Sequence, residues 1–222
     1  MKRGLDLLLS ACAMVVLAIP MLLLALLVWR KLGSPVFFRQ TRAGSHGRPF
    51  RMVKFRTMTD EHDCDGVLLP DAQRLTPFGR LLRNTSLDEL PELWNVFLGD
   101  MSLVGPRPLL ADYVPLYTTH QARRLEVKPG ITGWAQINGR NGLAWEERFD
   151  LDVWYVDNRS IRLDLWILIA TVWRVFKREG VSPKDQEIMP RFMGAGGGRS
   201  SPGDGQGERG RQSSMRKRRI GS

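Results

Sequence analysis

The chain has 222 residues, of which 43% are hydrophobic and 25% charged, and a formal net charge of +10. This length supports one domain with a hydrophobic core. Two cysteines, Cys12 and Cys64, exclude a disulfide-rich secreted scaffold and indicate a reducing compartment. The basic balance indicates an anionic partner, such as phosphate, acidic lipid or nucleic acid.

An apolar stretch from Leu7 to Trp29 contains no charged residue. At about 1.5 Å per residue, its helix would reach about 35 Å, enough to cross a hydrocarbon core of about 30 Å. Pro20 lies near the middle, where proline kinks a helix, and basic pairs flank both ends, Lys2–Arg3 and Arg30–Lys31. Cytoplasmic flanks favour Lys and Arg. We therefore expect a re-entrant helix that bends at Pro20; a spanning helix and a signal peptide are the alternatives.

Two short strands are predicted between Val36 and Met58, on either side of the turn Gly44–Gly47. Because side chains alternate along a strand, Lys54 and Arg56 should share one face of the second strand. Such a face can bind phosphate, and an ordinary solvated strand face is the alternative.

An acidic loop follows over residues 60–71, and apolar residues at helical spacing then predict an amphipathic basic helix over residues 75–83. A further helix is expected over residues 90–97, with an end at Gly99. Its apolar face is formed by Leu90, Leu93, Trp94 and Phe97.

Two adjacent carboxylates, Asp88 and Glu89, lie between these helices, after Arg83 and before the turn Gly105–Pro108. An acid pair beside arginines suits phosphoryl chemistry, because a carboxylate can attack phosphorus while a cation or metal offsets the charge. The run Ser86–Glu89 also fits a capping box, in which Glu89 returns a hydrogen bond to the start of a helix. The two roles are compatible, and the sequence leaves both open.

The C-terminal half is predicted as helix and loop over 109–128, a turn at 129–134 that feeds a short strand, and a turn at 139–142. Helices are expected over 146–158 and 161–176. The second carries tryptophans and flanking cations, which suit the membrane interface, and core packing is the alternative.

The tail, residues 194–222, is rich in Gly, Ser and Arg and holds half of the net charge. It has almost nothing to bury, so we expect a disordered segment that can bind acidic lipid. Its removal is expected to leave the chemistry intact.

Four runs of sequence together resemble one known family. They are K-F-R-T-M at 54–58, S-L-D-E-L-P-E-L-W-N-V at 86–96, G-D-M-S-L-V-G-P-R-P at 99–108 and K-P-G-I-T-G-W-A-Q-I-N-G-R-N at 128–141. From about Lys2 to about Arg178, the chain resembles the bacterial sugar transferases, the small monotopic phosphoglycosyl transferases. The resemblance covers the catalytic domain, and the extra N-terminal membrane domain of larger members is not expected.

The resemblance implies transfer of a phospho-sugar from a UDP-sugar to undecaprenyl phosphate, with release of UMP, as the first membrane step of glycan assembly. Asp88 matches the family's nucleophile, so an aspartyl phospho-sugar intermediate and ping-pong kinetics are expected. Asp88 and Glu89 would hold Mg²⁺. Short members often use UDP-linked N-acetylated sugars, which favours UDP and leaves the hexose open.

The basic positions of the matching runs are expected to contact phosphate or nucleotide. They are Lys54, Arg56, Arg83, Arg107 and Arg140. Asp152 matches an acid of the family, and it is interpreted either as a residue near the metal or nucleotide or as a plain helix-surface acid.

The fold expected from these interpretations is α+β, with a re-entrant membrane helix, interfacial amphipathic helices and a small β-sheet. Residues 1–32 would form the membrane helix, 33–193 the catalytic domain on the cytoplasmic face of the bacterial inner membrane, and 194–222 the tail. Expected partners are undecaprenyl phosphate, a UDP-sugar and anionic lipids, with downstream glycosyltransferases as further candidates.

Nucleic acid is not expected, because the sequence has neither a helix-turn-helix pattern nor a groove of interleaved aromatic and basic residues. Two other classes stay open at the level of residues. One is a non-enzymatic membrane-anchored binding protein, and the other is a membrane phosphatase that uses Asp88 with water as the acceptor.

Overall fold

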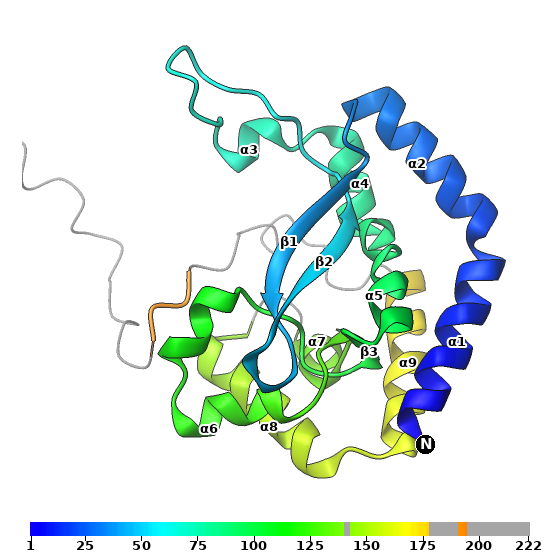
Figure 1. The fold of residues 1–222 in the computed structure, drawn as a ribbon, viewed down its shortest axis with the longest axis vertical. Helices are drawn as coiled ribbons and strands as arrows, with labels where there is room; N and C mark the ends of the chain where they lie inside the picture. Colours follow the sequence, from blue (N-terminus) through cyan, green and yellow to red (C-terminus); the bar gives the residue numbers. More distant parts are fainter. Residues whose placement is uncertain (140–142, 178–190, 195–222) are drawn as a thin grey trace, which may run out of the picture.

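A computed structural model describes residues 1–139, 143–177 and 191–194. The described residues form an α+β fold in which helices surround two small sheets (Figure 1). The predicted fold class is therefore confirmed at this level. Residues 195–222, which include nearly all of the predicted tail, and the turn residues 140–142 with Arg140 lie outside the described residues.

The N-terminal apolar stretch forms two helices, α1 (Lys2–Val16) and α2 (Ala18–Leu32), bent by 63°. The break lies at Leu17, one turn before Pro20. Proline crowds the carbonyl four residues earlier and cannot donate to it, so the chain bends at 16–17 and Pro20 falls in the first turn of α2. Within the described residues, no single helix is long and apolar enough to cross a membrane. The bent pair taken together has the length and composition that a crossing needs.

The predicted hairpin is confirmed. Strands β1 (Phe37–Ala43) and β2 (Pro49–Phe55) pair antiparallel in a seven-residue register from Phe37↔Phe55 to Ala43↔Pro49. A short 3-10 turn, η1 (Ser45–Gly47), joins the strands at the expected place. Met52 and Phe55 are buried, so β2 supplies both a core face and the site residue Lys54.

A second sheet pairs β3 (Ser102–Val104) with β4 (Gly130–Thr132) in parallel. The single small sheet of the prediction is therefore two separate sheets in the described residues. Gly105 follows β3 against Gly130, and a Cβ atom on Gly130 would lie 2.1 Å from the Gly105 nitrogen. This close approach fixes the turn that carries Arg107.

The helices before and after the acid pair are α4 (Pro77–Asn84), capped by Thr76, and α5 (Glu92–Leu98), which ends at Gly99. The capping-box interpretation is wrong. Ser86 has left-handed backbone angles (φ 56°, ψ 18°) and no side-chain cap, and Glu89 turns instead toward distant cations. The apolar face of α5 is also divided, because Leu93 is buried while Trp94 is half-exposed.

The remaining elements are short helices followed by two long ones. In the 129–134 region, the strand β4 precedes the turn and a helix, α7 (Trp134–Gly139), follows it, so the predicted order of turn and strand was reversed. The predicted long helices are confirmed as α8 (Trp145–Asn158) and α9 (Ile161–Lys177). The other elements are α3 (Asp71–Arg74), η2 (Leu87–Glu89), η3 (Ala111–Leu116), α6 (Thr119–Ala122) and η4 (Arg123–Glu126).

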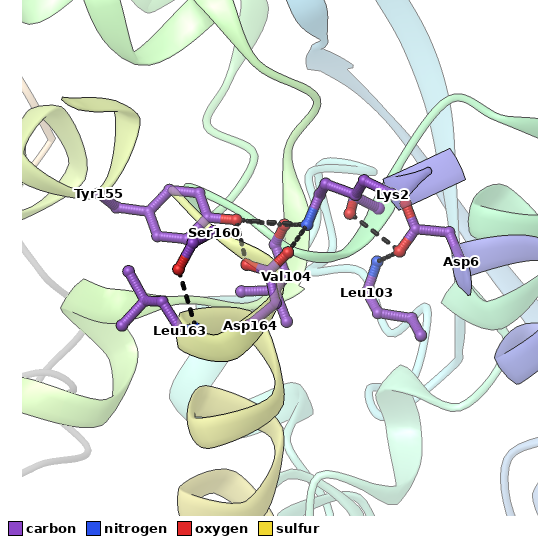
Figure 2. A network of polar contacts seen from close by, with 9 residues as sticks. Lys2, Asp6, Leu103, Val104, Tyr155, Ser160, Leu163 and Asp164 are labelled. Atoms are coloured by element: carbon purple, nitrogen blue, oxygen red, sulfur yellow. Dashed lines mark hydrogen bonds and ion pairs between the residues drawn. The ribbon is translucent and has the colours of Figure 1, made fainter. Parts of the chain in front are cut away.

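The start of α1 is bound to the body of the protein, the described residues from 33 onward, by a polar network (Figure 2). The Lys2 ammonium donates to the Val104 carbonyl at 3.1 Å and pairs with the buried Asp164 of α9. Asp6, also buried, accepts from the Ser102 hydroxyl and the Leu103 amide, each at 3.1 Å. The basic residue at the start of the apolar stretch therefore has specific acceptors in the described protein.

The end of α2 is bound to the same body at the hairpin. Val28 packs with Phe55 and Leu82 in one buried cluster, and the Arg56 guanidinium donates to the Leu32 carbonyl. Both ends of the bent helix pair thus contact the body of the protein, and the pair runs along one side of the molecule (Figure 1).

Candidate active site

Three acids gather where η2 leads into α5. Asp88 and Glu89 lie on η2, and Glu92 is the first residue of α5. Two cations from other parts of the chain reach them: Lys54 from β2, and Arg107 from the turn after β3. The structure therefore brings together four predicted site residues that lie up to 53 positions apart in sequence.

Glu89 is held by both cations through one oxygen. Its Oε1 accepts from Lys54 Nζ at 2.7 Å and from Arg107 Nη2 at 2.5 Å. Burial opposes ionisation, but the Arg107 and Lys54 charges outweigh it and hold the pKa of Glu89 far below its usual range. Glu89 is therefore an anion at neutral pH.

Asp88 is buried but differs from its neighbour in having no ion partner among the described residues. It makes no ion pair or side-chain hydrogen bond with the described residues, although it is only 7% exposed. Burial and the adjacent Glu89 charge raise the pKa of Asp88 to about 6. The carboxylate is thus ionised at neutral pH and free to react, which is what a nucleophile needs.

Glu92 is the site acid that sequence reasoning missed. Its side chain is 2% exposed, and Oε1 lies 3.1 Å from Lys54 Nζ without the alignment of a hydrogen bond. Burial and the Glu89 charge raise the pKa of Glu92 to about 7. Its position three residues after Glu89, at the first turn of a helix, was the available sequence signal.

The other predicted positions have specific partners. Arg83 donates from Nε to the Thr57 hydroxyl at 2.9 Å and lines the cavity described below. The structure does not bring Arg56 to the acids, because Arg56 pairs with Asp60 at 2.7 Å beside the end of α2.

Asp152 is not a helix-surface acid. It is buried in α8 and pairs with the equally buried Arg124, whose Nη2 lies 2.8 Å from Asp152 Oδ2. Arg124 also donates to the Arg107 carbonyl at 2.7 Å, so this pair supports the turn that carries Arg107. Asp152 lines the cavity as well, and Arg124 is a supporting residue that sequence reasoning missed.

A cavity of about 400 Å³ extends from Glu89 and Arg107 to the bend between α1 and α2. One part of its lining is apolar and includes Ala13 and Leu17 at that bend. Another part is cationic and includes Arg83, Arg107, Arg148 and Arg174. A cavity lined by both cationic and apolar residues suits a ligand that carries phosphate and lipid.

The acid pair has the ligand chemistry of a Mg²⁺ site. Mg²⁺ is usually held by one or two carboxylates, substrate phosphates and water. Asp88 has no ion partner among the described residues, and both cations on Glu89 contact the same oxygen, so carboxylate oxygens remain for a metal. Within the described part of the chain, no group of three or more metal-ligating side chains forms a complete protein site. The residues fit a metal that shares its coordination with a substrate.

Comparison with known proteins decides the family. The sequence profile described as bacterial sugar transferase matches residues 1–178. This chain belongs to the bacterial sugar transferase family. The sugar transferase EpsL of Bacillus subtilis (strain 168), whose name marks it as uncharacterised, is 57% identical over 196 residues, or 88% of this chain and 97% of EpsL.

Two further members of the bacterial sugar transferase family have names that state an activity. The UDP-glucose:undecaprenyl-phosphate glucose-1-phosphate transferase of Xanthomonas campestris pv. campestris is 45% identical over 69% of this chain and 34% of its own length. The undecaprenyl-phosphate galactose phosphotransferase of Salmonella typhimurium is 37% identical over 81% of this chain and 41% of its own length. The chain thus spans well under half of these two longer relatives.

Proposed function

We propose that the protein transfers a sugar phosphate from a UDP-sugar to undecaprenyl phosphate and releases UMP. The names of the Xanthomonas and Salmonella relatives support this substrate pair. The observation that carries the proposal is the pairing pattern of the acids. Glu89 is neutralised by Lys54 and Arg107, while Asp88 beside it is ionised and unpaired among the described residues.

The chemistry takes two displacements at one phosphorus. An Asp88 carboxylate oxygen attacks the phosphorus next to the sugar, and the bond to the UMP oxygen breaks. This leaves the phospho-sugar as an acyl phosphate on Asp88. An oxygen of undecaprenyl phosphate then attacks the same phosphorus and displaces the carboxylate, which gives undecaprenyl-diphosphate-sugar. Arg107 and Lys54 offset the charge that develops on the phosphoryl oxygens in both steps.

A bound Mg²⁺ would supply screening of the diphosphate charge when held by Asp88 and Glu89. Glu89 suits this role because it keeps its negative charge at all physiological pH values. Replacement of Glu89 by Gln should leave the protein folded but change the Mg²⁺ dependence of UMP release. An unchanged dependence would remove Glu89 from the metal site.

We infer that α1 and α2 enter and leave the same face of the membrane. Each helix has 15 residues, so each reaches about 22 Å and falls short of a hydrocarbon core of about 30 Å. Both outer ends are bound to the body of the protein, through Lys2 and through the Leu32 carbonyl. The side chains around the bend are apolar and strongly exposed, among them Val15, Val16, Ile19 and Leu22.

The re-entrant geometry explains how one site can serve a soluble and a lipid substrate. The cavity reaches from the acid cluster to Leu17 at the bend, so the phosphate of a lipid can approach from the bilayer side. The exposed Trp166 and Trp173 of α9 suit the headgroup level, where tryptophan is enriched. On this basis we place the catalytic domain at the cytoplasmic face of a bacterial inner membrane.

The test is UMP release by the full chain in lipid nanodiscs with undecaprenyl phosphate and Mg²⁺. UDP-glucose, UDP-galactose and UDP-N-acetylated hexoses are supplied one at a time. We expect release with at least one donor, and its loss with EDTA and with Asp88→Asn. Release of free sugar phosphate without lipid acceptor at the same rate would instead indicate a phosphatase.

A further inference from the structure

One side-chain amide in the cavity lining has no hydrogen-bond partner among the described residues. Gln136 lies in α7 and lines the cavity, as do Glu89 and Arg107. Its Oε1 and Nε2 atoms are both shielded from solvent, and neither makes a hydrogen bond with the residues that the structure describes. An unpaired buried polar group destabilises a fold, so the amide indicates a ligand that completes its hydrogen bonds.

Other polar groups on the same wall are already paired within the protein. The Thr132 and Thr171 hydroxyls contact each other at 2.7 Å, and Thr171 donates to the Ile167 carbonyl at 2.7 Å. Asp152 is held by Arg124. Gln136 differs from these neighbours because, within the described part of the chain, its amide makes no hydrogen bond.

The amide lies next to the turn that carries Arg107. A Cβ atom on Gly133 would lie 2.8 Å from Gln136 Oε1 and 2.1 Å from the Gly105 carbonyl oxygen, so both groups border the same glycine. The terminal torsion of a glutamine is broad and soft. A small rotation can turn the amide from Gly133 toward the cavity without moving the backbone.

The chemistry of the amide selects the kind of group that can satisfy it. A primary amide needs an acceptor for its NH₂ and a donor for its oxygen. Ionised phosphate offers acceptors only, and a polyprenyl chain offers neither. A nucleotide sugar offers both, either as neighbouring hydroxyls of the hexose or as the imide edge of uracil.

We propose that Gln136 is a specificity-determining residue that binds such a donor–acceptor pair of the nucleotide sugar. This inference rests on the proposed function. In this inference Gln136 binds the uncharged part of the UDP-sugar, its uracil or its hexose. The arginines of the same cavity, including Arg83 and Arg107, bind the phosphates.

The test measures binding rather than turnover. All proteins carry Asp88→Asn, so that no covalent step occurs, and equilibrium binding of UDP-sugars and of UMP is measured in lipid nanodiscs with Mg²⁺. Gln136→Met removes both hydrogen-bonding atoms at similar volume. Asn138→Ala, which removes an exposed amide from the same helix, is the matched control.

We expect Gln136→Met to weaken binding of the UDP-sugar about tenfold. Its thermal midpoint should stay the same or rise, because an unpaired buried amide is removed. Asn138→Ala should change neither the affinity for the UDP-sugar nor the thermal midpoint. An equal loss of UMP affinity would assign Gln136 to the uracil edge, whereas an unchanged UMP affinity would assign it to the hexose hydroxyls.

Equal UDP-sugar affinity of Gln136→Met and its parent would contradict this inference alone. So would a weaker affinity accompanied by a lower thermal midpoint, because that result indicates a structural role. If neither the Asp88→Asn parent nor the wild-type protein binds or reacts with any UDP-sugar, the proposed function fails and this inference with it.

Discussion

At the scale of single residues, the site separates the roles of two adjacent acids by their partners. Glu89 receives both Lys54 and Arg107, whereas Asp88 has only the long-range effect of these charges and a pKa raised to about 6. The left-handed backbone of Ser86, which costs energy for a residue other than glycine, lies two residues before Asp88. The turn that leads into the acid pair therefore contains a strained backbone conformation at Ser86.

The raised pKa of Asp88 predicts how the protein's free energy of unfolding depends on pH. An acid whose pKa is raised by folding destabilises the folded state above its unfolded pKa of about 3.8, and the full cost is present above about pH 6. Asp88→Asn should therefore raise the free energy of unfolding at pH 8 by about 1–3 kcal/mol. Near pH 3.5 the gain should be small.

The measurement is thermal unfolding of the detergent-solubilised protein at the two pH values. Asp65→Asn, in the exposed loop, is the control and should have little effect at either pH. A destabilised Asp88→Asn protein at pH 8 would contradict the electrostatic description of the site.

The same pKa predicts the pH dependence of the first chemical step. Only the ionised Asp88 carboxylate can attack phosphorus, so the rate of the UMP burst should fall about tenfold per pH unit below about pH 6. The burst must be measured without lipid acceptor, because a phosphate monoester also titrates near pH 6. A burst rate that is constant from pH 7 to pH 5 would exclude Asp88 as the titrating nucleophile.

At the scale of the elements, the bent helix pair is fixed at both ends. Lys2 satisfies the buried Asp164, which also accepts from the Tyr155 hydroxyl at 2.6 Å (Figure 2). Removal of one partner leaves a buried charge without compensation, which is worse than the loss of both. The start of α1 is therefore bound into the rest of the described protein.

Lys2→Met should lower the free energy of unfolding by about 2–4 kcal/mol, because Asp164 is then buried without its cation. Addition of Asp164→Asn to this variant should recover part of the loss. Thermal unfolding of the single and double variants checks both expectations. A Lys2→Met protein as stable as the parent would show that the ion pair does not hold α1 in place.

The re-entrant path that we propose for α1 and α2 predicts that both outer ends face the same side of the membrane. Gly4→Cys and Lys31→Cys, both at exposed positions, are made separately after Cys12 and Cys64 are replaced by serine. A membrane-impermeant maleimide should label both in inside-out vesicles and neither in right-side-out vesicles. Labelling of the two positions from opposite sides would establish a spanning helix.

Some elements could be predicted from the sequence because their signals are local. The hairpin follows from alternating side chains around Gly44–Gly47, and α8 and α9 follow from helical spacing. The parallel pairing of β3 with β4 depends on three-residue strands whose paired residues are 28 positions apart, which leaves no local pattern. The capping-box prediction was wrong because Glu89 pairs with Lys54 and Arg107, which lie on other elements, and not with the start of its own helix.

The candidate site shows the same limit. Asp88, Glu89, Lys54 and Arg107 could be selected from motifs, since acids and cations in those runs suit phosphate chemistry. Which of these residues pair with each other could not be predicted from the motifs. Arg56 shows this, because it lies in the same motif as Lys54 but binds the Leu32 carbonyl and Asp60. Gln136 could be recognised only from its unsatisfied buried atoms, whereas Glu92 had a sequence signal in its spacing from Glu89.

At the scale of the whole molecule, one cavity joins a charged cluster to the apolar bend of a helix pair. That arrangement matches a reaction between a soluble nucleotide sugar and a phosphate carried by a lipid. The exposed apolar side chains at the bend and on α9 would place the cavity at the membrane surface.

The central claim is that Asp88 carries the phospho-sugar between two displacements. Intact-mass measurement of the full chain, given a UDP-sugar and Mg²⁺ without lipid acceptor, tests it most directly. We predict an added mass of one phospho-sugar, which undecaprenyl phosphate removes and Asp88→Asn prevents. If no adduct forms, and UMP appears only when both substrates are present together, the transfer is a single direct displacement and the account is contradicted.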